Sequence, residues 1–273
     1  MSAGASPLAA PDPWNLVADG YEAISRPFLA RFSHTGLAKL DYGARTRAID
    51  IACGPGTTAL LLAPEIAHIT CIDFAPGMLE QLQRNASAAN VTNLDIVEAD
   101  GQALPFADNS FDLAISMFGL MFFPDRRKGF AELHRVLAPR GQALVSSWAS
   151  ADHSSYTRAI IAALQPEGAE PQAPRALSGL ENPVVFEAEM REAGFVDIAV
   201  GATEHGIEVA NLERFWHESV RATAPLTLMK HHSPAEEWAE TERIALDRLH
   251  RRFSGQLPIT LTATAWIATG RKP

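Results

Sequence analysis

Between residues 47 and 148 the sequence alternates between short apolar runs and longer stretches with helical periodicity. Runs such as Ala48–Cys53 and Leu113–Met117 are apolar throughout, and Pro76–Ala89 and Arg126–Leu137 are the clearest helical stretches. Strands that are apolar on both faces are typical of a parallel sheet covered by helices on each side. The pattern therefore predicts an α/β fold. The other apolar runs are Ile69–Ile72, Leu94–Val97 and Ala143–Ser147.

The rest of the chain carries looser signals. Small residues and prolines over residues 1–13 predict a flexible tail. We expect one domain over 14–273, in which the segments 14–42, 151–183 and 207–256 cover the substrate side of the sheet. The elements expected outside the central region are amphipathic helices over 14–40 broken near Pro27, a long proline-containing loop over 165–183, helices over 184–193, 211–222 and 234–252, the last opened by a capping box at Ser233–Glu236, and strands over 195–200 and 259–269.

Composition narrows the classes of function. The 273 residues include 32 acidic and 23 basic side chains, so the formal charge of −9 disfavours a nucleic-acid partner. The longest apolar run, Leu113–Phe123, is shorter than the roughly 20 residues that a membrane span needs. Two cysteines in apolar surroundings, Cys53 and Cys71, favour buried thiols in a reducing compartment, and we expect a cytoplasmic protein. No histidine or cysteine cluster has metal-ligand spacing, so no metal site is expected.

A glycine-containing segment, Asp50–Gly56, follows the first predicted strand, and Thr57 and Thr58 open a helix after it. Glycines at this place permit a tight turn and let backbone amides approach a ligand. The spacing Gly54-x-Gly56-x-x-Ala59 also satisfies the dinucleotide fingerprint, and a strand-to-helix turn without a ligand is a further interpretation.

Two further acidic positions end the next two predicted strands. Asp73 can accept hydrogen bonds from ribose hydroxyls or cap the helix that starts at Pro76, and both roles are compatible. Asp100-Gly101 suits an exocyclic amine but is also an ordinary turn pair. Because ligands of open α/β sheets bind outside the carboxyl ends of the strands, these positions predict one site together with the glycine segment.

Taken together, these motifs resemble the class I S-adenosylmethionine-dependent methyltransferases, in particular the small-molecule branch that includes the quinone-biosynthesis enzymes. The resemblance covers about residues 14–150 and, less closely, the final strand. It implies a Rossmann-like, doubly wound, seven-stranded sheet, mostly parallel with an antiparallel C-terminal strand, plus a helical cover. The segments that carry it besides Asp50–Gly56, Asp73 and Asp100-Gly101 are Leu104–Phe106, Asn109–Asp112, Phe122–Asp125 and Arg135–Gln142.

The resemblance also implies a cofactor, S-adenosylmethionine, and roles for individual residues. Asp50 would support the ammonium group, Asp73 the ribose hydroxyls and Asp100 the adenine amine, while Ser116, just past the fourth strand, would contribute a backbone carbonyl. Cys53 occupies a position at which the family often has another small residue. The full set of implied cofactor-binding residues is Tyr21, Asp50, Gly54, Gly56, Asp73, Phe74, Met78, Asp100, Gly101, Ser116, Met117 and Phe118.

The implied activity is methyl transfer to a small acceptor. Aromatic and apolar residues of the cover segments, such as Phe32 and Trp216, favour a hydrophobic or aromatic acceptor, although packing of the cover onto the sheet is the alternative. His153, a few residues beyond the fifth strand, is the candidate general base. An NAD(P)-dependent oxidoreductase and a non-catalytic S-adenosylmethionine-binding protein are the rival functions. The sequence leaves open O-, N- or C-methylation and the oligomeric state.

Overall fold

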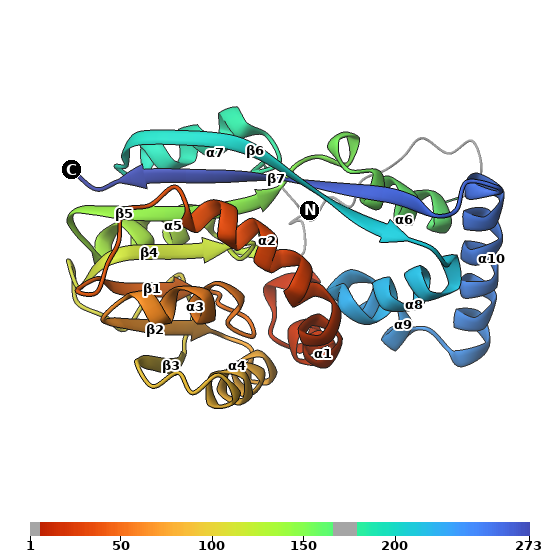
Figure 1. Ribbon diagram of the computed structural model, residues 1–273, viewed down its shortest axis with the longest axis horizontal. Helices are drawn as coiled ribbons and strands as arrows, with labels where there is room; N and C mark the ends of the chain where they lie inside the picture. The colour runs from red at the N-terminus through yellow and green to blue at the C-terminus, as the bar shows by residue number, and fades with distance from the viewer. Residues whose placement is uncertain (1–5, 166–178) are drawn as a thin grey trace, which may run out of the picture.

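The computed structural model describes residues 6–165 and 179–273, and its centre is a seven-stranded sheet (Figure 1). The strand order is β3-β2-β1-β4-β5-β7-β6. Neighbouring strands pair in parallel except for β7, which is antiparallel to both β5 and β6. The predicted seven-stranded α/β sheet with an antiparallel C-terminal strand is confirmed. The strands are β1 Arg47–Ile51, β2 His68–Asp73, β3 Leu94–Glu98, β4 Phe111–Met117, β5 Leu137–Trp148, β6 Val196–Val209 and β7 Ile259–Arg271.

Helices connect the strands and cover the sheet. In Figure 1, α2 crosses the near face of the sheet, while α5 and α7 lie behind it. The α-helices are α1 Asp12–Gly20, α2 Arg26–Leu37, α3 Thr57–Leu62, α4 Pro76–Ala88, α5 Arg126–Val136, α6 Ser155–Leu164, α7 Pro183–Glu192, α8 Leu212–Ala222, α9 Ala224–His232 and α10 Ala235–Phe253. The short turns are 3-10 helices at Pro7–Ala9, Ala63–Glu65, Leu120–Phe122 and Ala151–His153, and a π-helical segment at Tyr21–Ser25.

Burial explains why the central strands read as continuous apolar runs. In β1 the successive residues Ala48, Ile49 and Ile51 are all buried, so side chains on both faces of the strand are excluded from water. The buried residues of the central strands and of the flanking helices form one large hydrophobic core. This core holds the carboxyl ends of β1, β2 and β4 in a common row, because Asp50 pairs in register with Cys71 of β2 and Ile115 of β4.

The C-terminal helices form a second, separate core. In Figure 1, β6 and β7 continue beyond the rest of the sheet, and α8, α9 and α10 surround their extension. Trp216 of α8 is fully buried and stacks on Trp238 of α10 with 6.3 Å between ring centroids. Phe215 and Leu226 belong to the same cluster. The apolar residues of 207–256 that were expected to meet an acceptor therefore pack against one another, which is the alternative that the sequence left open.

Several local predictions are wrong at the N-terminus and in the C-terminal half. Residues 6–13 are not a flexible tail, because Leu8 is buried and α1 begins at Asp12. The predicted capping box is absent, because the Ser233 hydroxyl donates to the Met229 carbonyl and makes no cap bond to α10. The sequence analysis did not predict α6 and α9. Most of the predicted 165–183 loop, residues 166–178, lies outside the described part of the chain.

Candidate functional site

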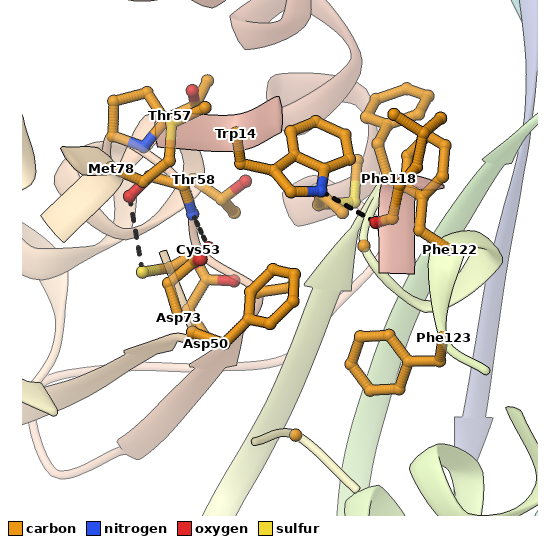
Figure 2. A pocket seen from close by; sticks show the side chains of 18 of the residues that line it. Trp14, Asp50, Cys53, Thr57, Thr58, Asp73, Met78, Phe118, Phe122 and Phe123 are labelled. Atoms are coloured by element: carbon orange, nitrogen blue, oxygen red, sulfur yellow. Dashed lines mark hydrogen bonds between the residues drawn. The ribbon is translucent and has the colours of Figure 1, made fainter. Parts of the chain in front are cut away.

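A pocket opens at the carboxyl ends of the central strands, beneath the N-terminal helices (Figure 2). It contains about 1010 Å³ of space free of protein atoms, part of it open to solvent. The lining comes from Leu8, Ala9, Trp14, Tyr21, Leu29, Ser33, Asp50, Ala52, Cys53, Gly54, Pro55, Thr57, Thr58, Asp73, Phe74, Met78, Ala99, Asp100, Gly101, Gln102, Met117, Phe118, Gly119, Phe122, Phe123 and Pro124.

The loop after β1 has an unusual backbone. Gly54 and Gly56 have φ angles of +55° and +84°, and Ala52 has a φ of +56°, where a glycine fits without strain. Ala52 is therefore the residue of this loop whose backbone is strained, whereas Cys53, which follows it, does not have a positive φ. The two glycines serve different purposes: a Cβ on Gly54 would meet no heavy atom within 4 Å, whereas one on Gly56 would lie 2.2 Å from Leu82 Cδ1. Gly54 exposes backbone to the pocket, and Gly56 permits close packing behind it.

Asp73 connects the glycine loop to the start of α4 through hydrogen bonds. Its Oδ2 accepts a hydrogen bond from the Gly54 amide at 2.8 Å, and its Oδ1 accepts one from the Ala75 amide at 3.0 Å. Burial raises the pKa of Asp73 to about 6, although these amides lower it. Both roles that the sequence suggested are compatible with this arrangement: the carboxylate organises the entry to α4 and also lines the pocket.

Asp50 lies beside Asp73 in Figure 2 and is almost completely buried. Its Oδ2 has no hydrogen-bond partner within the described structure. Burial, together with the negative charge of Asp73, raises the pKa of Asp50 to about 8. A buried polar atom without a partner is costly, so the pocket wall presents an acceptor that a ligand donor can satisfy.

Asp100 and Gly101 form the third acidic corner of the pocket. Asp100 Oδ1 accepts hydrogen bonds from the Gln102 amide at 2.8 Å and from Gln102 Nε2 at 3.0 Å, so the predicted turn is present. Gly101 is needed for packing, since a Cβ there would lie 2.6 Å from Phe123 Cζ. Both residues nevertheless line the same pocket as Asp73. The turn and ligand interpretations therefore remain compatible.

An aromatic cap closes the pocket opposite the carboxylates. In Figure 2, Trp14, Phe118 and Phe122 lie across from Asp50 and Asp73. Trp14 Nε1 donates to the Leu8 carbonyl at 2.9 Å, and its ring meets that of Phe122 edge-on at 4.9 Å. Sequence analysis missed both Leu8 and Trp14 as site residues, because only the folded N-terminal segment carries them over the strand ends.

Phe118 forms a rigid wall at the end of β4. Its φ of +59° is rare for a bulky residue, and its amide donates to the buried Ser146 Oγ at 3.0 Å. Its ring contacts Trp148 at 4.3 Å and Phe32 at 5.5 Å between centroids. Strained backbone of this kind clusters at functional sites, which makes Phe118 a candidate for fixing the shape of the pocket.

The pocket brings together ten of the twelve predicted cofactor residues, whereas Gly56, Ser116 and the predicted base His153 do not line it. Gly56 packs against Leu82 behind the pocket. Ser116 is inside β4 rather than past it, is fully buried and does not line the pocket. His153 is exposed, does not line the pocket, and has its ring 6.4 Å from that of Trp266. Its backbone carbonyl accepts a hydrogen bond from Thr264 at 2.6 Å, so the chain after β5 follows β7.

Among the described residues of the three predicted cover segments, those that line the pocket all belong to 14–42: Trp14, Tyr21, Leu29 and Ser33. Ser33 Oγ lies 2.8 Å from Thr58 Oγ1, and both residues are buried. The described residues of 151–183 and 207–256 contribute no lining residue. The physical reason is that β6 and β7 carry the C-terminal helices beyond the row of strand ends.

The charges of the pocket favour a ligand with donor groups. Asp50, Asp73 and Asp100 line it, and no lysine, arginine or histidine does so among the described residues. Such a lining suits an ammonium group, ribose hydroxyls and an exocyclic amine, and it disfavours a pyrophosphate. In the same described portion of the chain, no group of three or more possible metal ligands occurs, and no helix has the length and apolarity to cross a membrane.

Comparison with known proteins identifies the central region. Residues 48–141 match a family model described as a methyltransferase domain. An uncharacterised Mycobacterium tuberculosis protein is 34% identical over 161 residues, 59% of this chain and 58% of the relative. A demethylmenaquinone methyltransferase of Listeria monocytogenes is 35% identical over 100 residues, 36% of this chain and 42% of the relative. The matches thus span 58% or less of the length of these curated relatives.

Solved structures of methyltransferases share the fold. One is a phosphoethanolamine N-methyltransferase 2 of Haemonchus contortus in complex with phosphomonomethylethanolamine and S-adenosylhomocysteine. It has a TM-score of 0.55 and 18% identity to this chain, and the alignment covers 89% of this chain and 52% of that one. At this identity the likeness concerns the fold.

Proposed function

We propose that the protein transfers a methyl group from S-adenosylmethionine to a small apolar or aromatic acceptor, and the match of residues 48–141 to a methyltransferase-domain family supports this proposal. The observation that carries this proposal is a single pocket with three carboxylates on one side and an aromatic cap on the other. The first side suits a cationic nucleoside cofactor, and the second suits a flat or apolar acceptor.

The proposed cofactor residues divide along the row of strand ends. Asp73 of β2 holds the ribose hydroxyls, and Asp100, after β3, holds the adenine amine. Asp50 and the exposed backbone of Gly54 hold the methionyl end near β1. Phe74, Met78, Gly101, Met117 and Phe118 complete the walls, and Tyr21 covers the cofactor from the N-terminal helices. S-Adenosylhomocysteine in the Haemonchus contortus structure supports a cofactor of this class.

The bound sulfonium supplies an electrophilic methyl group, and the chain has to align the acceptor with it and exclude water. The strained Phe118 and the ring of Trp148 behind it give the acceptor side a fixed shape. Trp14 and Phe122, the other members of the aromatic cap, close the pocket against solvent. His153 has no part in this proposal, because it does not line the pocket.

The acceptor end of the pocket lies toward α2 and β4 in this proposal. Leu29, Met117 and Phe118 give it an apolar surface, and the hydroxyl pair of Ser33 and Thr58 supplies polar contacts. The demethylmenaquinone methyltransferase among the relatives supports an acceptor with an aromatic ring. The small-molecule enzyme among the structures supports an acceptor of low molecular weight.

Two features argue against the oxidoreductase alternative. In the dinucleotide-binding fold the six strands are parallel in the order 3-2-1-4-5-6, whereas here the antiparallel β7 lies between β5 and β6. The Gly54 amide of the glycine loop also donates to Asp73 Oδ2 at 2.8 Å, so it is not free to bind a pyrophosphate. Cys53 and Cys71 are both free and buried, which keeps a reducing cytoplasm as the proposed location.

The test is transfer of a labelled methyl group from S-adenosylmethionine to defined acceptors: a demethylated naphthoquinol, a catechol and a primary amine. We expect labelled product with a ring acceptor, strong loss in Asp73→Ala, and unchanged activity in Asp95→Ala. Asp95 is the matched control, since it lies on neighbouring β3, is 69% exposed and bonds His68 outside the pocket. Binding of the cofactor without transfer to any acceptor would favour the non-catalytic binding protein.

A further inference from the structure

The unpartnered oxygen of Asp50 has a consequence for ligand binding. Asp50 Oδ2 is buried on the pocket wall without a hydrogen-bond partner in the described structure. The neighbouring Asp73 has both carboxylate oxygens bonded to main-chain amides, of Gly54 and Ala75. The two carboxyl groups therefore differ: the negative form of Asp73 is solvated by the backbone, whereas one oxygen of Asp50 is not solvated by any group.

Among the described residues, the groups that line the pocket around Asp50 include no lysine, arginine or histidine to compensate its charge. Asp73 and Cys71 face it from β2 and Cys53 from the glycine loop, and Tyr21 stands near Asp73 from the N-terminal helices. A hydrogen bond with the backbone of Ala59 in α3 lowers the pKa of Asp50, but by less than burial and Asp73 raise it. Two like charges in a buried site do not both ionise readily, and the site lowers its free energy by keeping one proton.

We propose that Asp50 and Asp73 share one proton in the free protein, and that the cationic end of the cofactor displaces it, so that cofactor binding releases a proton from Asp50 to solvent. This inference rests on the proposed function, because it requires a ligand whose ammonium group reaches Asp50. The ammonium donates to Oδ2 and supplies the positive charge that the protein lacks there. Asp50 is then a proton-exchanging positioning residue for the cofactor.

The number of protons released follows from the protonation states of Asp50 and of the ligand's amine at pH 7. Burial and Asp73 raise the pKa of Asp50 to about 8, so its carboxyl is about 90% protonated at pH 7. The ligand's amine is that of a free amino acid, which is more basic than the α-amino group of a peptide, so it is already charged at pH 7 and takes up almost no proton. The expected net release is therefore about 0.9 proton per ligand at pH 7, and affinity rises about tenfold from pH 6 to pH 7.

The experiment counts protons by isothermal titration calorimetry of the full chain at pH 7, in buffers of different ionisation enthalpy. The ligands are S-adenosylhomocysteine and methylthioadenosine, which has the same nucleoside but no ammonium group. We expect about 0.9 proton released with the first and none with the second. Release of the same number of protons by both ligands, or binding of S-adenosylhomocysteine without release, would overturn the inference and leave the proposed function standing.

Two variants localise the proton. In Asp50→Asn we expect no release and an affinity that changes about twofold at most between pH 6 and pH 7. In Asp100→Asn we expect weaker binding with the same release, because that residue contacts the other end of the proposed site. Unchanged release in Asp50→Asn would overturn the inference. Absence of any binding of S-adenosylhomocysteine by the wild type would instead contradict the proposed function itself. The pH dependence of the wild type tests the inference even if a variant fails to fold.

Discussion

Alanine substitutions at Gly54 and Gly56 separate the two purposes of the glycine loop. Both residues have positive φ, so alanine at either position introduces strain of about 1–2 kcal/mol. A more restricted unfolded chain offsets about 0.4–1 kcal/mol of this strain. At Gly54 a Cβ meets open space, and the expected net loss of stability is about 0.5–1 kcal/mol. The same alanine lies in the pocket, so we expect S-adenosylhomocysteine binding to weaken.

At Gly56 the new Cβ would lie 2.2 Å from Leu82 Cδ1, and Leu82 is fully buried. Overpacking of this kind adds about 1–3 kcal/mol, so Gly56→Ala should lose about 2–4 kcal/mol in all. Urea unfolding at an unchanged slope measures both variants. The double variant with Leu82→Ala provides the check: the two losses should not add, and their coupling should be about 1–3 kcal/mol. Equal losses at Gly54 and Gly56, or no coupling with Leu82, would refute the reasoning.

Three further predictions concern the same site. Ala52→Gly removes left-handed backbone strain of about 1–2 kcal/mol, but the added conformational entropy of the unfolded chain offsets about 0.4–1 kcal/mol of this gain. The free energy of unfolding, measured in urea, should therefore rise by about 0.5–1 kcal/mol. A fall would contradict the assigned strain. The pKa of Asp50 is raised from its ordinary 3.8 to about 8, so the native state binds this proton more tightly than the unfolded state, and stability falls as pH rises through that range. Asp50→Asn lacks this titration, so its stability relative to the wild type should increase from pH 5 to pH 8.5, as measured by urea unfolding; a difference that stays the same at both pH values would contradict it. Deletion of residues 1–10 removes Leu8 from the pocket and should weaken S-adenosylhomocysteine binding several-fold by calorimetry, while the unfolding transition of the remaining chain persists; unchanged affinity would contradict the cap.

The sheet could be predicted from the sequence because two-sided burial is a local signal. A strand such as β1 must be apolar on both faces, and Asp50 at its end stands out against that pattern. The row of acidic residues at the strand ends follows from parallel topology alone. Asp73 and Asp100 line the same pocket, and the family resemblance indicates which cofactor to test there.

The parts that the sequence did not predict depend on tertiary contacts or on ambiguous local signals. Trp14 reaches the pocket only because Leu8 folds back to accept its indole hydrogen, and no periodicity encodes that contact. The start of α9 contains Pro225, which fits the first turn of a helix but reads as a breaker in sequence. Ser154 before α6 is a signal that could have been used, since its hydroxyl accepts a hydrogen bond from the Thr157 amide.

His153 illustrates the limit of reasoning from sequence distance. It follows β5 by only a few residues, which suggests a place near the strand ends. However, Ala149 donates its amide to the Thr264 carbonyl, and the His153 carbonyl accepts from the Thr264 hydroxyl. The chain is thereby held along β7 on its way to the second core. Pairing with a strand more than a hundred residues away decides where this histidine lies, and local sequence does not contain that information.

The most direct test of the central claim is a calorimetric titration with S-adenosylhomocysteine, run beside NADH on the wild type, Asp73→Ala and Asp95→Ala. Loss of the Asp73 carboxylate also frees the Gly54 and Ala75 amides, so urea unfolding should accompany the titration to show that each variant is folded. The account predicts micromolar binding of S-adenosylhomocysteine by the wild type and by Asp95→Ala, loss of binding in Asp73→Ala, and no binding of NADH. Binding of NADH instead, or undiminished binding of S-adenosylhomocysteine by a folded Asp73→Ala, would contradict it.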